Sequence, residues 1–252
     1  MTSQHLYIVT GSSRGVGAAL VQQLLKPGHV VLGIARQHNE ALQSMADEAG
    51  LQLEQWPRDL GDPLPVARDL QQWLSAFDPA VFGSVNLINN AGVIGGGAPV
   101  EQIALELLSN ALRVGLEATL LLSAAFLERT ADWPGRRRIL NISSGLGRRA
   151  MAGSTAYCAA KAGMDHLSRA IALEQATQPN PARIVSMAPG VIDTDMQVEL
   201  RAMDPAKFPD HGRFMQLKSE GLLMSPQACA QQLLARLQAA SFGDEPVGDL
   251  RG

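Results

Sequence analysis

Residues 10–17 read TGSSRGVG and follow the apolar, β-branched run LYIVT at 6–10. Glycine at positions 11, 15 and 17 permits a tight turn and lets the backbone approach a phosphate group closely. The helical pattern of 15–26 begins inside this motif, so a helix N-terminus would face the same place and favour negative charge there. A strand, a glycine-rich turn and a helix in this order predict a dinucleotide-binding unit.

Outward from this turn, short apolar runs alternate with longer segments of helical period. Such alternation indicates a parallel sheet that is covered by helices on both faces. Strands are expected at 6–10, 29–35, 51–56, 84–89, 137–143, 182–188 and 246–250, and helices at about 15–26, 39–49, 63–77, 101–130, 155–177 and 226–240. The sequence therefore predicts an α/β fold of the Rossmann type, a single doubly wound domain over residues 1–252 with a seven-stranded parallel sheet.

The composition is that of a globular protein without a strong net charge. Of 252 residues, 46% are hydrophobic and 18% are charged, and the formal net charge is −3. We therefore expect no binding to nucleic acid or to a membrane surface, and we interpret the run Arg136–Arg138 as a solvated face before a strand. The two cysteines lack metal-ligand spacing, and no apolar run has the length of a membrane span or the pattern of a signal peptide. A cytoplasmic location is expected.

Four motifs that contain glycine or small polar residues follow predicted strands. Besides TGSSRGVG, these are NNAG at 89–92, NISSG at 141–145 and APGVIDT at 188–194. The carboxyl ends of parallel strands meet at one edge of a sheet, which is where open α/β proteins bind ligands. We therefore expect the four motifs to form one site.

The end of the second predicted strand indicates which dinucleotide is bound. An acidic residue there would bind the adenine ribose 2′-hydroxyl of NAD, but the sequence has Ala35 and Arg36, with Arg14 in the glycine-rich turn. Two guanidinium groups can bind a 2′-phosphate through charge-assisted hydrogen bonds. We therefore expect NADPH/NADP+ rather than NADH. The alternative is that both arginines are merely solvated.

The stretch TAYCAAKAG at 155–163 places Tyr157 and Lys161 one helical turn apart. A nearby ammonium group lowers the pKa of a tyrosine, which could then exchange a proton with a carbonyl oxygen. Taken alone, such a pair is more often part of an amphipathic surface. Ser144, thirteen residues before Tyr157, and the surrounding glycine motifs favour the catalytic interpretation.

This combination of motifs resembles the short-chain dehydrogenase/reductase family over nearly the whole chain. The stretches ILNISSGLG, AYCAAKAG, APGVIDTDMQ and LKSEGLLMSP are most similar to the branch of sepiapterin reductases and bacterial benzil reductases. The resemblance implies that Tyr157 is the general acid, that Lys161 lowers its pKa and binds the nicotinamide ribose, and that Ser144 holds the carbonyl oxygen. Ser143 is the alternative to Ser144, but a shift of one residue in a strand points a side chain to the other face.

The resemblance also assigns contacts to the cofactor. Asp59 would contact the adenine and NNAG would line the adenine ribose, the alternatives being a helix N-cap and a turn that needs small residues. The expected cofactor-binding residues are Gly11, Ser13, Arg14, Gly15, Val16, Gly17, Arg36, Asp59, Leu60, Asn89, Asn90, Ala91, Gly92, Tyr157, Lys161, Pro189, Gly190, Val191, Ile192 and Thr194. Asp193, Asp195 and the histidines lack the spacing of metal ligands, so we expect no metal.

The expected activity is an NADPH-dependent reduction of a small-molecule carbonyl compound. Hydride transfer to a ketone or an apolar or aromatic, benzil-like 1,2-diketone would give a hydroxy product. The connection 190–225 is predicted to be a substrate lid, with an apolar wall formed by Met196, Met203, Phe208, Phe214 and Met215. The alternatives are a sepiapterin-type pteridine reductase and an NADPH-binding regulator without turnover.

The long helices suggest self-association. The segments 101–130 and 155–177 correspond to helices that form dimer interfaces in the family, and LLLSAAFL is apolar nearly all round. Core packing against the sheet is the other explanation of this pattern. We expect a homodimer or a homotetramer.

Gly115 departs from the family pattern. Many members have an asparagine in the long helix after NNAG, where this sequence has glycine. Glycine within a helix costs roughly 1 kcal/mol relative to alanine. In the family, the proton relay behind the lysine uses the backbone carbonyl of this residue, so we expect a local helix distortion that frees the Gly115 carbonyl.

Overall fold

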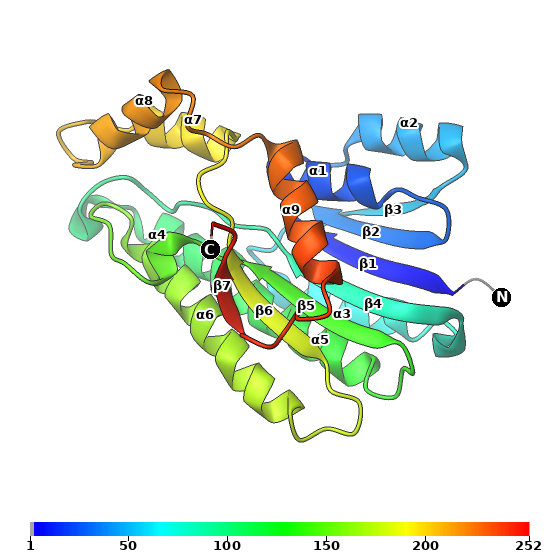
Figure 1. Cartoon of the computed structure of the whole chain (residues 1–252). Coiled ribbons are helices and arrows are strands. Elements are labelled where there is room, and N and C mark those ends of the chain that lie inside the picture. Colours follow the sequence, from blue (N-terminus) through cyan, green and yellow to red (C-terminus); the bar gives the residue numbers. More distant parts are fainter. Residues whose placement is uncertain (1–2, 252) are drawn as a thin grey trace.

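Seven parallel strands form the centre of the computed structural model, which describes residues 3–251 (Figure 1). They are β1 (Gln4–Thr10), β2 (His29–Ala35), β3 (Gln52–Pro57), β4 (Phe82–Asn89), β5 (Arg136–Ile142), β6 (Arg183–Ala188) and β7 (Val247–Asp249). The strand order is β3-β2-β1-β4-β5-β6-β7, so the direction of winding reverses between β1 and β4. This confirms the predicted fold class, and the reversal marks the place where an open sheet of this kind leaves a crevice.

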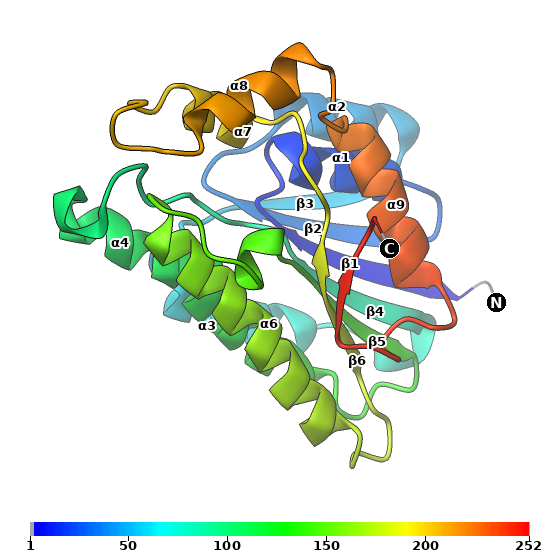
Figure 2. The ribbon, with the colours of Figure 1, turned by 60° about the vertical axis from the view of Figure 1, so that its left-hand side comes forward.

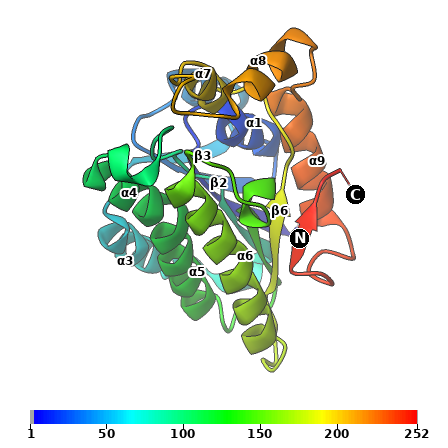
Figure 3. The same cartoon turned by 90° about the vertical axis from the view of Figure 1, so that its left-hand side faces the viewer.

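Helices cover both faces of the sheet. They are α1 (Gly15–Leu24), α2 (Glu40–Ala49), α3 (Pro63–Leu74), α4 (Leu105–Leu112), α5 (Ala118–Arg129), α6 (Thr155–Gln175), α7 (Asp195–Arg201), α8 (His211–Ser219) and α9 (Pro226–Gln238). Figure 3 shows α3, α5 and α6 on one face, with α1 and α9 together on the other. A π-helical turn at Arg113–Glu117 joins α4 to α5.

The two cores follow from the direction in which strand side chains point. Tyr7 and Val9 of β1 belong to the core that β1 shares with α1 and α9, whereas Leu6 and Ile8 belong to the core beneath α3 and α5. All four side chains are buried. Because both faces of a parallel sheet are covered, successive residues of its strands are apolar, as the continuous runs in the sequence predict.

Local signals explain several helix boundaries. The side chain of Asn39 accepts a hydrogen bond from the backbone N–H of Leu42, and α2 ends at Gly50, whose φ of 63° lies in the left-handed region. Ser225 caps α9 in the same way through the N–H of Ala228. These residues place the helices within two residues of their predicted limits.

The arginines at the start of β5 correct the prediction of a solvated face. Arg136 is exposed, but Arg137 and Arg138 are only 3% and 7% exposed. The guanidinium group of Arg137 donates hydrogen bonds of 2.6, 2.9 and 3.1 Å to two backbone carbonyls and to the hydroxyl of Thr130. Arg138 donates to the carbonyl of Leu237 at 2.7 Å. Both cations can be buried here because they find acceptors inside the protein.

One continuous helical segment of the described chain, Leu105–Arg129, is long and apolar enough to cross a membrane if only its length and composition are considered. It has 25 residues and a mean hydropathy of 1.3 in its 18-residue window, and half of that window is buried within the protein. The segment lies within the helix that was predicted over 101–130. It supplies Val114, Ala118, Leu122 and Phe126 to the core beneath the sheet.

Replacing Arg137 with alanine should lower the free energy of unfolding by about 2–3 kcal/mol, because two carbonyls and a hydroxyl would lose their charged donor. The matched control is Arg136→Ala, which removes an exposed guanidinium from the neighbouring position and should change stability by no more than about 0.5 kcal/mol. Urea unfolding of both variants measures the difference. Equal losses would contradict a structural role for the buried cation.

Candidate active site

The glycine-rich turn after β1 depends on three missing side chains. Gly11 and Gly15 have φ angles of 66° and 55°, which glycine adopts at little cost. A Cβ added at Gly17 would lie 2.0 Å from the carbonyl oxygen of Gly11. Since α1 begins at Gly15, its N-terminus opens directly onto this turn. The turn therefore forms a cradle, a space lined by backbone atoms that larger side chains at these positions would fill.

Asn90 and Thr10 join the NNAG motif to that turn. Nδ2 of Asn90 donates to the carbonyl of Thr10 at 2.9 Å, and the Thr10 hydroxyl accepts from the N–H groups of Asn90 and Ala91 at 2.9 and 3.0 Å. Asn89 uses its amide differently: it is buried and donates to Asn141 of β5 at 2.8 Å. The structure thus brings Asn90 and Ala91 to the turn, whereas the side chain of Asn89 supports the sheet beneath it.

The predicted adenine side of the crevice follows β2 and β3. Arg36 is exposed directly after β2, and Asp59 accepts a hydrogen bond from the N–H of Gly61 at 2.8 Å. Leu60, which lies between Asp59 and Gly61 in this turn, is buried. Ser13 and Val16 lie in the glycine-rich segment itself; the carbonyl of Ser13 accepts from Asn39, and Val16 is buried.

The loop after β6 borders the crevice on its other side. Pro189 is buried, and Gly190 has a φ of 87° that favours glycine. The N–H of Asp193 donates to the carbonyl of Met224 at 2.9 Å, and the N–H of Met224 donates to the carbonyl of Val191 at 3.0 Å. Ile192 and Met224 thereby form an isolated parallel β-bridge. This pairing closes the base of the segment 190–225.

Arg14 connects the glycine-rich turn to the start of α7. Its Nη1 lies 3.0 Å from Oδ2 of Asp195, and both side chains are about two-thirds exposed. Thr194, which precedes α7, has its methyl carbon 3.4 Å from the position of a Cβ added at Gly15. The two sides of the crevice therefore lie close together. The ion pair of Arg14 is an interaction that sequence analysis did not predict.

Ser144, Tyr157 and Lys161 come together where β5 ends and α6 begins. A short 3-10 turn follows Ser144, whose hydroxyl accepts a hydrogen bond from the N–H of Leu146 at 3.1 Å. Tyr157 shares a side-chain hydrogen bond with Ser144. Nζ of Lys161 lies 5.7 Å from the centroid of the Tyr157 ring. Ser143 points elsewhere, with its hydroxyl donating to Asp165 at 2.6 Å.

Burial governs the protonation of this site. It raises the pKa of Tyr157 above its usual range, and the hydrogen bond with Ser144 opposes the shift. It lowers the pKa of Lys161 to about 8, against the attraction of the negative charge on Asp165. Burial is therefore the largest influence on the pKa of Tyr157, and the lowering of this pKa by Lys161 stays a prediction. The ammonium group lies over the ring and donates to the carbonyl of Ile142 at 2.7 Å.

Two glycines lie against α6, and at Gly115 the approach is close. A Cβ at Gly92 would lie 3.6 Å from Nζ of Lys161, and one at Gly115 would lie 3.0 Å from Cβ of Ala160. Gly115 is part of the π-helical turn Arg113–Glu117, which confirms the expected helix distortion. Its carbonyl accepts a weak hydrogen bond from the hydroxyl of Thr119 at 3.3 Å. Gly115 thus combines an irregular backbone with close packing against α6.

The segment 190–225 contains α7 and α8, two short helices that the sequence pattern did not reveal. Figures 1 and 2 show them across the edge of the sheet at which the strands end. They build an apolar group, here called the α7–α8 cluster, of Ile94, Met151, Leu200, Phe208 and Phe214 with Leu146, Cys158, Met196, Met203 and Leu217 at its margin. Leu146 and Cys158 are neighbours of the site residues. Four of the five predicted wall residues belong to this cluster, whereas Met215 is 49% exposed.

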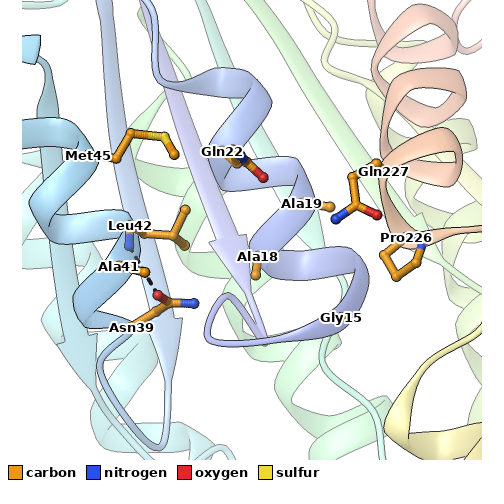
Figure 4. A pocket seen from close by; sticks show the side chains of 10 residues that line it. All are labelled: Gly15, Ala18, Ala19, Gln22, Asn39, Ala41, Leu42, Met45, Pro226 and Gln227. Atoms are coloured by element: carbon orange, nitrogen blue, oxygen red, sulfur yellow. Dashed lines mark hydrogen bonds between the residues drawn. The ribbon is translucent and has the colours of Figure 1, made fainter.

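A pocket of about 270 Å³ lies beside the glycine-rich turn, between α1, α2 and the start of α9 (Figure 4). Its lining consists of Gly15, Ala18, Ala19, Gln22, Asn39, Ala41, Leu42, Met45, Pro226 and Gln227. Gly15 is its one member among the predicted site residues, so this pocket is separate from the crevice that the four motifs form. A second hollow of about 390 Å³ runs from Gly61 along α4 and adjoins the Asp59 turn.

A doubly wound parallel sheet with a glycine cradle and a Ser–Tyr–Lys set at its carboxyl edge defines an oxidoreductase. A family model described as short chain dehydrogenase matches residues 5–205, and the chain belongs to this family. It is 33% identical to the benzil reductase ((S)-benzoin forming) of Bacillus cereus over 96% of both chains. It is 35% identical to the sepiapterin reductase of Rattus norvegicus over 93% of this chain and 92% of the relative.

A solved structure gives the same fold. A putative NAD(P)-dependent gluconate 5-dehydrogenase from Beutenbergia cavernae with bound NADP is 26% identical, with a TM-score of 0.80 over 98% of this chain and 95% of the other. The likeness covers nearly the whole of both chains. It confirms the family that the motifs resemble.

One buried residue of the site region, Asp165, was not among the predicted site residues. Asp165 follows Lys161 by one helical turn, just as Lys161 follows Tyr157, so all three lie on one face of α6. This spacing was the available signal. What the spacing did not reveal is that two other strands and a turn place hydrogen-bond donors around the carboxylate.

Proposed function

We propose that the protein is an NADPH-dependent carbonyl reductase that converts an apolar or aromatic ketone or 1,2-diketone into a hydroxy product. The observation that carries the proposal is the convergence of Ser144, Tyr157 and Lys161 beside the α7–α8 cluster. The benzil reductase relative supports a diketone substrate. The sepiapterin reductase relative supports a pteridine side chain as the second candidate.

The residues of the crevice fit a dinucleotide cofactor. The cradle at 11–17 offers backbone and a helix N-terminus to a pyrophosphate, and any side chain at Gly17 would fill it. Arg36 and Arg14 would bind the 2′-phosphate, with Lys161 at the nicotinamide ribose and Thr194 at the nicotinamide end. When bound, NADPH supplies the hydride. The NADP in the Beutenbergia cavernae structure supports this choice.

The three site residues have complementary parts in the proposed reaction. Ser144 would donate a hydrogen bond to the substrate carbonyl oxygen and so place it next to Tyr157. Because burial raises the pKa of Tyr157, its hydroxyl keeps its proton at neutral pH and can deliver it to that oxygen. The positive charge of Lys161 favours the phenolate that results. Proton delivery is thus assigned to Tyr157 and charge stabilisation to Lys161.

The α7–α8 cluster supports the proposed substrate class. Met196 and Met203 are flexible and polarisable, and the stacked rings of Phe208 and Phe214 have centroids 5.6 Å apart. Such a wall favours an apolar or aromatic substrate over a small polar one. Residues 190–225 would act as the substrate lid. The ion pair of Arg14 links the start of this lid to the glycine-rich turn.

Removing the hydroxyl of Tyr157 tests the proposal. With benzil as substrate, Tyr157→Phe should lower kcat by about 10² or more, because the general acid is lost, while the dissociation constant of NADPH stays nearly unchanged. Stopped-flow or steady-state NADPH consumption and fluorescence titration give the two values. The matched control is Tyr7→Phe, which removes a hydroxyl from the buried face of β1 and should leave kcat within about twofold.

Three outcomes separate the candidate functions. A higher kcat/KM for benzil than for acetone or a sugar supports the apolar wall, and the reverse order contradicts it. A higher kcat/KM for sepiapterin than for benzil would favour the pteridine reductase. A wild-type protein that binds NADPH and turns over none of these compounds would favour the regulator.

Replacing Arg36 with alanine tests the choice of cofactor. The variant should bind NADPH about tenfold more weakly and NADH almost unchanged, because a charge-assisted hydrogen bond to the 2′-phosphate is lost. Arg136→Ala, at the opposite edge of the sheet, is the control for removing one exposed guanidinium. The dissociation constants come from fluorescence titration. A wild type that binds NADH as tightly as NADPH would rule out the proposed selectivity.

We also propose that the protein forms a homodimer or homotetramer through the helices on one face of the sheet. Leu105 of α4 and Leu173 of α6 are 78% and 75% exposed, and Leu107, Leu112 and Leu120 are also exposed. Covering these side chains would remove apolar surface from water. Light scattering at micromolar concentration should give the mass of a dimer or a tetramer. The mass of a single 26.8 kDa chain would contradict the proposal.

A cytoplasmic location agrees with the state of the two cysteines. Cys158 and Cys229 are free thiols, and burial raises the pKa of Cys229 to about 12. Such a thiol is unreactive and suits a reducing compartment. We infer that the protein works in the cytoplasm.

A further inference from the structure

A buried carboxylate lies directly behind the proposed catalytic residues. Asp165 of α6 is 2% exposed and follows Lys161 by one helical turn. Its Oδ1 accepts hydrogen bonds from the hydroxyls of Ser143 and Ser186, each at 2.6 Å, and its Oδ2 lies 3.2 Å from Nε of Arg148. The three donors come from the end of β5, from β6 and from the turn after β5. Asp165 is therefore a junction of four parts of the chain.

These hydrogen bonds join the two segments that carry the site. Ser143 immediately precedes Ser144, and Asp165 belongs to the helix of Lys161. The turn after Ser144 also packs tightly on this helix. A Cβ added at Gly147 would lie 2.9 Å from the carbonyl oxygen of Lys161 and 3.0 Å from Oδ2 of Asp165. The position of Ser144 relative to α6 thus depends on contacts made around the carboxylate.

Asp165 also offsets the cost of burying Lys161. Burial lowers the pKa of Lys161 to about 8, and the charge of Asp165 is the influence that opposes this shift. Lys161 donates to the carbonyl of Ile142 at 2.7 Å, which satisfies one proton of the ammonium group without adding negative charge. Asp165 supplies that charge from the next turn of the same helix.

The other ionisable groups around α6 do not replace it. Tyr157, on the same face of the helix, remains a neutral phenol because burial raises its pKa. Arg148, from the turn after β5, is a cation and would disfavour a second positive charge. Asp249 of β7 forms an ion pair with Arg251 at 2.7 Å. Without the carboxylate on α6, the effect of burial on Lys161 would be unopposed.

We propose that Asp165 is a positioning residue of the site that fixes the Ser144 turn to α6 and keeps Lys161 protonated at neutral pH. The activity readout of this proposal rests on the proposed reductase function. The hydrogen bonds and the burial of Asp165 are independent of the substrate. Asp165 would act on the reaction through Ser144 and Lys161, without touching the substrate itself.

The decisive variant is Asp165→Asn. Its amide oxygen can still accept from the hydroxyls of Ser143 and Ser186, so these two hydrogen bonds are kept, whereas the negative charge and the acceptor that faces Arg148 are lost. The alkaline limb of kcat/KM should move to lower pH by about one unit or more. At pH 8 the variant should therefore be about fivefold or more slower than wild type, while at pH 6 it should recover to within about threefold. Recovery in acid is a result that misfolding alone would not produce.

Two further variants separate charge from structure. Ser186→Ala removes one hydrogen bond to the same carboxylate and keeps its charge, so any loss of rate should be equal across the pH range. Arg148→Gln removes the neighbouring cation and should move the alkaline limb to higher pH. The opposite shifts of Asp165→Asn and Arg148→Gln are the expected result. A limb that stays in place in both variants would overturn the assignment, and if Asp165→Asn does not fold, Arg148→Gln alone decides.

A measurement without substrate distinguishes this proposal from the proposed function. In unfolded chains Lys161 keeps its ordinary pKa, whereas in folded Asp165→Asn its pKa would fall below that in the folded wild type. As the pH rises, the folded variant would therefore lose the Lys161 proton earlier than the folded wild type does, while its unfolded chain still holds that proton. Its free energy of unfolding should consequently approach that of wild type as the pH rises from 6 to 9. A constant difference would contradict the charge role even if no substrate were turned over.

Discussion

The carbonyl oxygen of Gly11 lies so close to Gly17 that one methyl group at residue 17 would prevent the first turn from forming. This contact sets where α1 leaves β1 and so how its N-terminus meets the edge of the sheet. Asn90 extends the constraint to β4, because its amide donates to the carbonyls of both Thr10 and Gly11. The winding reversal between β1 and β4 is thereby built around one short stretch of backbone. The motifs after β5 and β6 follow outward from β4 in the sheet, so their positions relative to the turn depend on this contact.

The sequence predicted the sheet well because most of its signals are local. The run at 29–35 matches β2 at both ends, and each predicted helix before residue 190 and after 225 is present in the structure. Long-range partners explain the failures. Arg137 and Arg138 were predicted to be solvated because charged residues usually are. The carbonyls that accept their hydrogen bonds belong to segments far along the chain. The helices α7 and α8 are too short for their period to be recognised, and packing on the cluster around Phe208 stabilises them instead.

Part of the site could also be predicted from local signals in the sequence. Tyr157 and Lys161 are separated by one helical turn, so their common face follows from the sequence alone, and Ser144 ends the preceding strand. Their electrostatics did not follow. The sequence pattern predicted only that the ammonium group lowers the pKa of the phenol, whereas burial is the largest influence on both residues and shifts each toward its neutral form. Burial depends on how α6 packs between the sheet and the turn after Ser144, which no spacing of residues encodes.

Charges of alternating sign continue from the site to the end of the chain. Lys161 is followed by Asp165, whose carboxylate pairs with Arg148, and Arg148 also donates to the carbonyl of Gly248 in β7 at 2.8 Å. The next residue, Asp249, pairs with the side chain of Arg251, and these arginines hold its pKa near 2.

The side chain of Arg251 then packs over Gly190, with its Cδ 3.4 Å from the position of a Cβ there. Gly190 belongs to the loop that leads into residues 190–225. The buried positive charge of Lys161 is thus followed by a series of alternating charges, Asp165, Arg148, Asp249 and Arg251, of which Arg251 is exposed to solvent. The short strand β7 is therefore more than an edge of the sheet, because it connects the electrostatics of α6 to the base of the segment that covers the site.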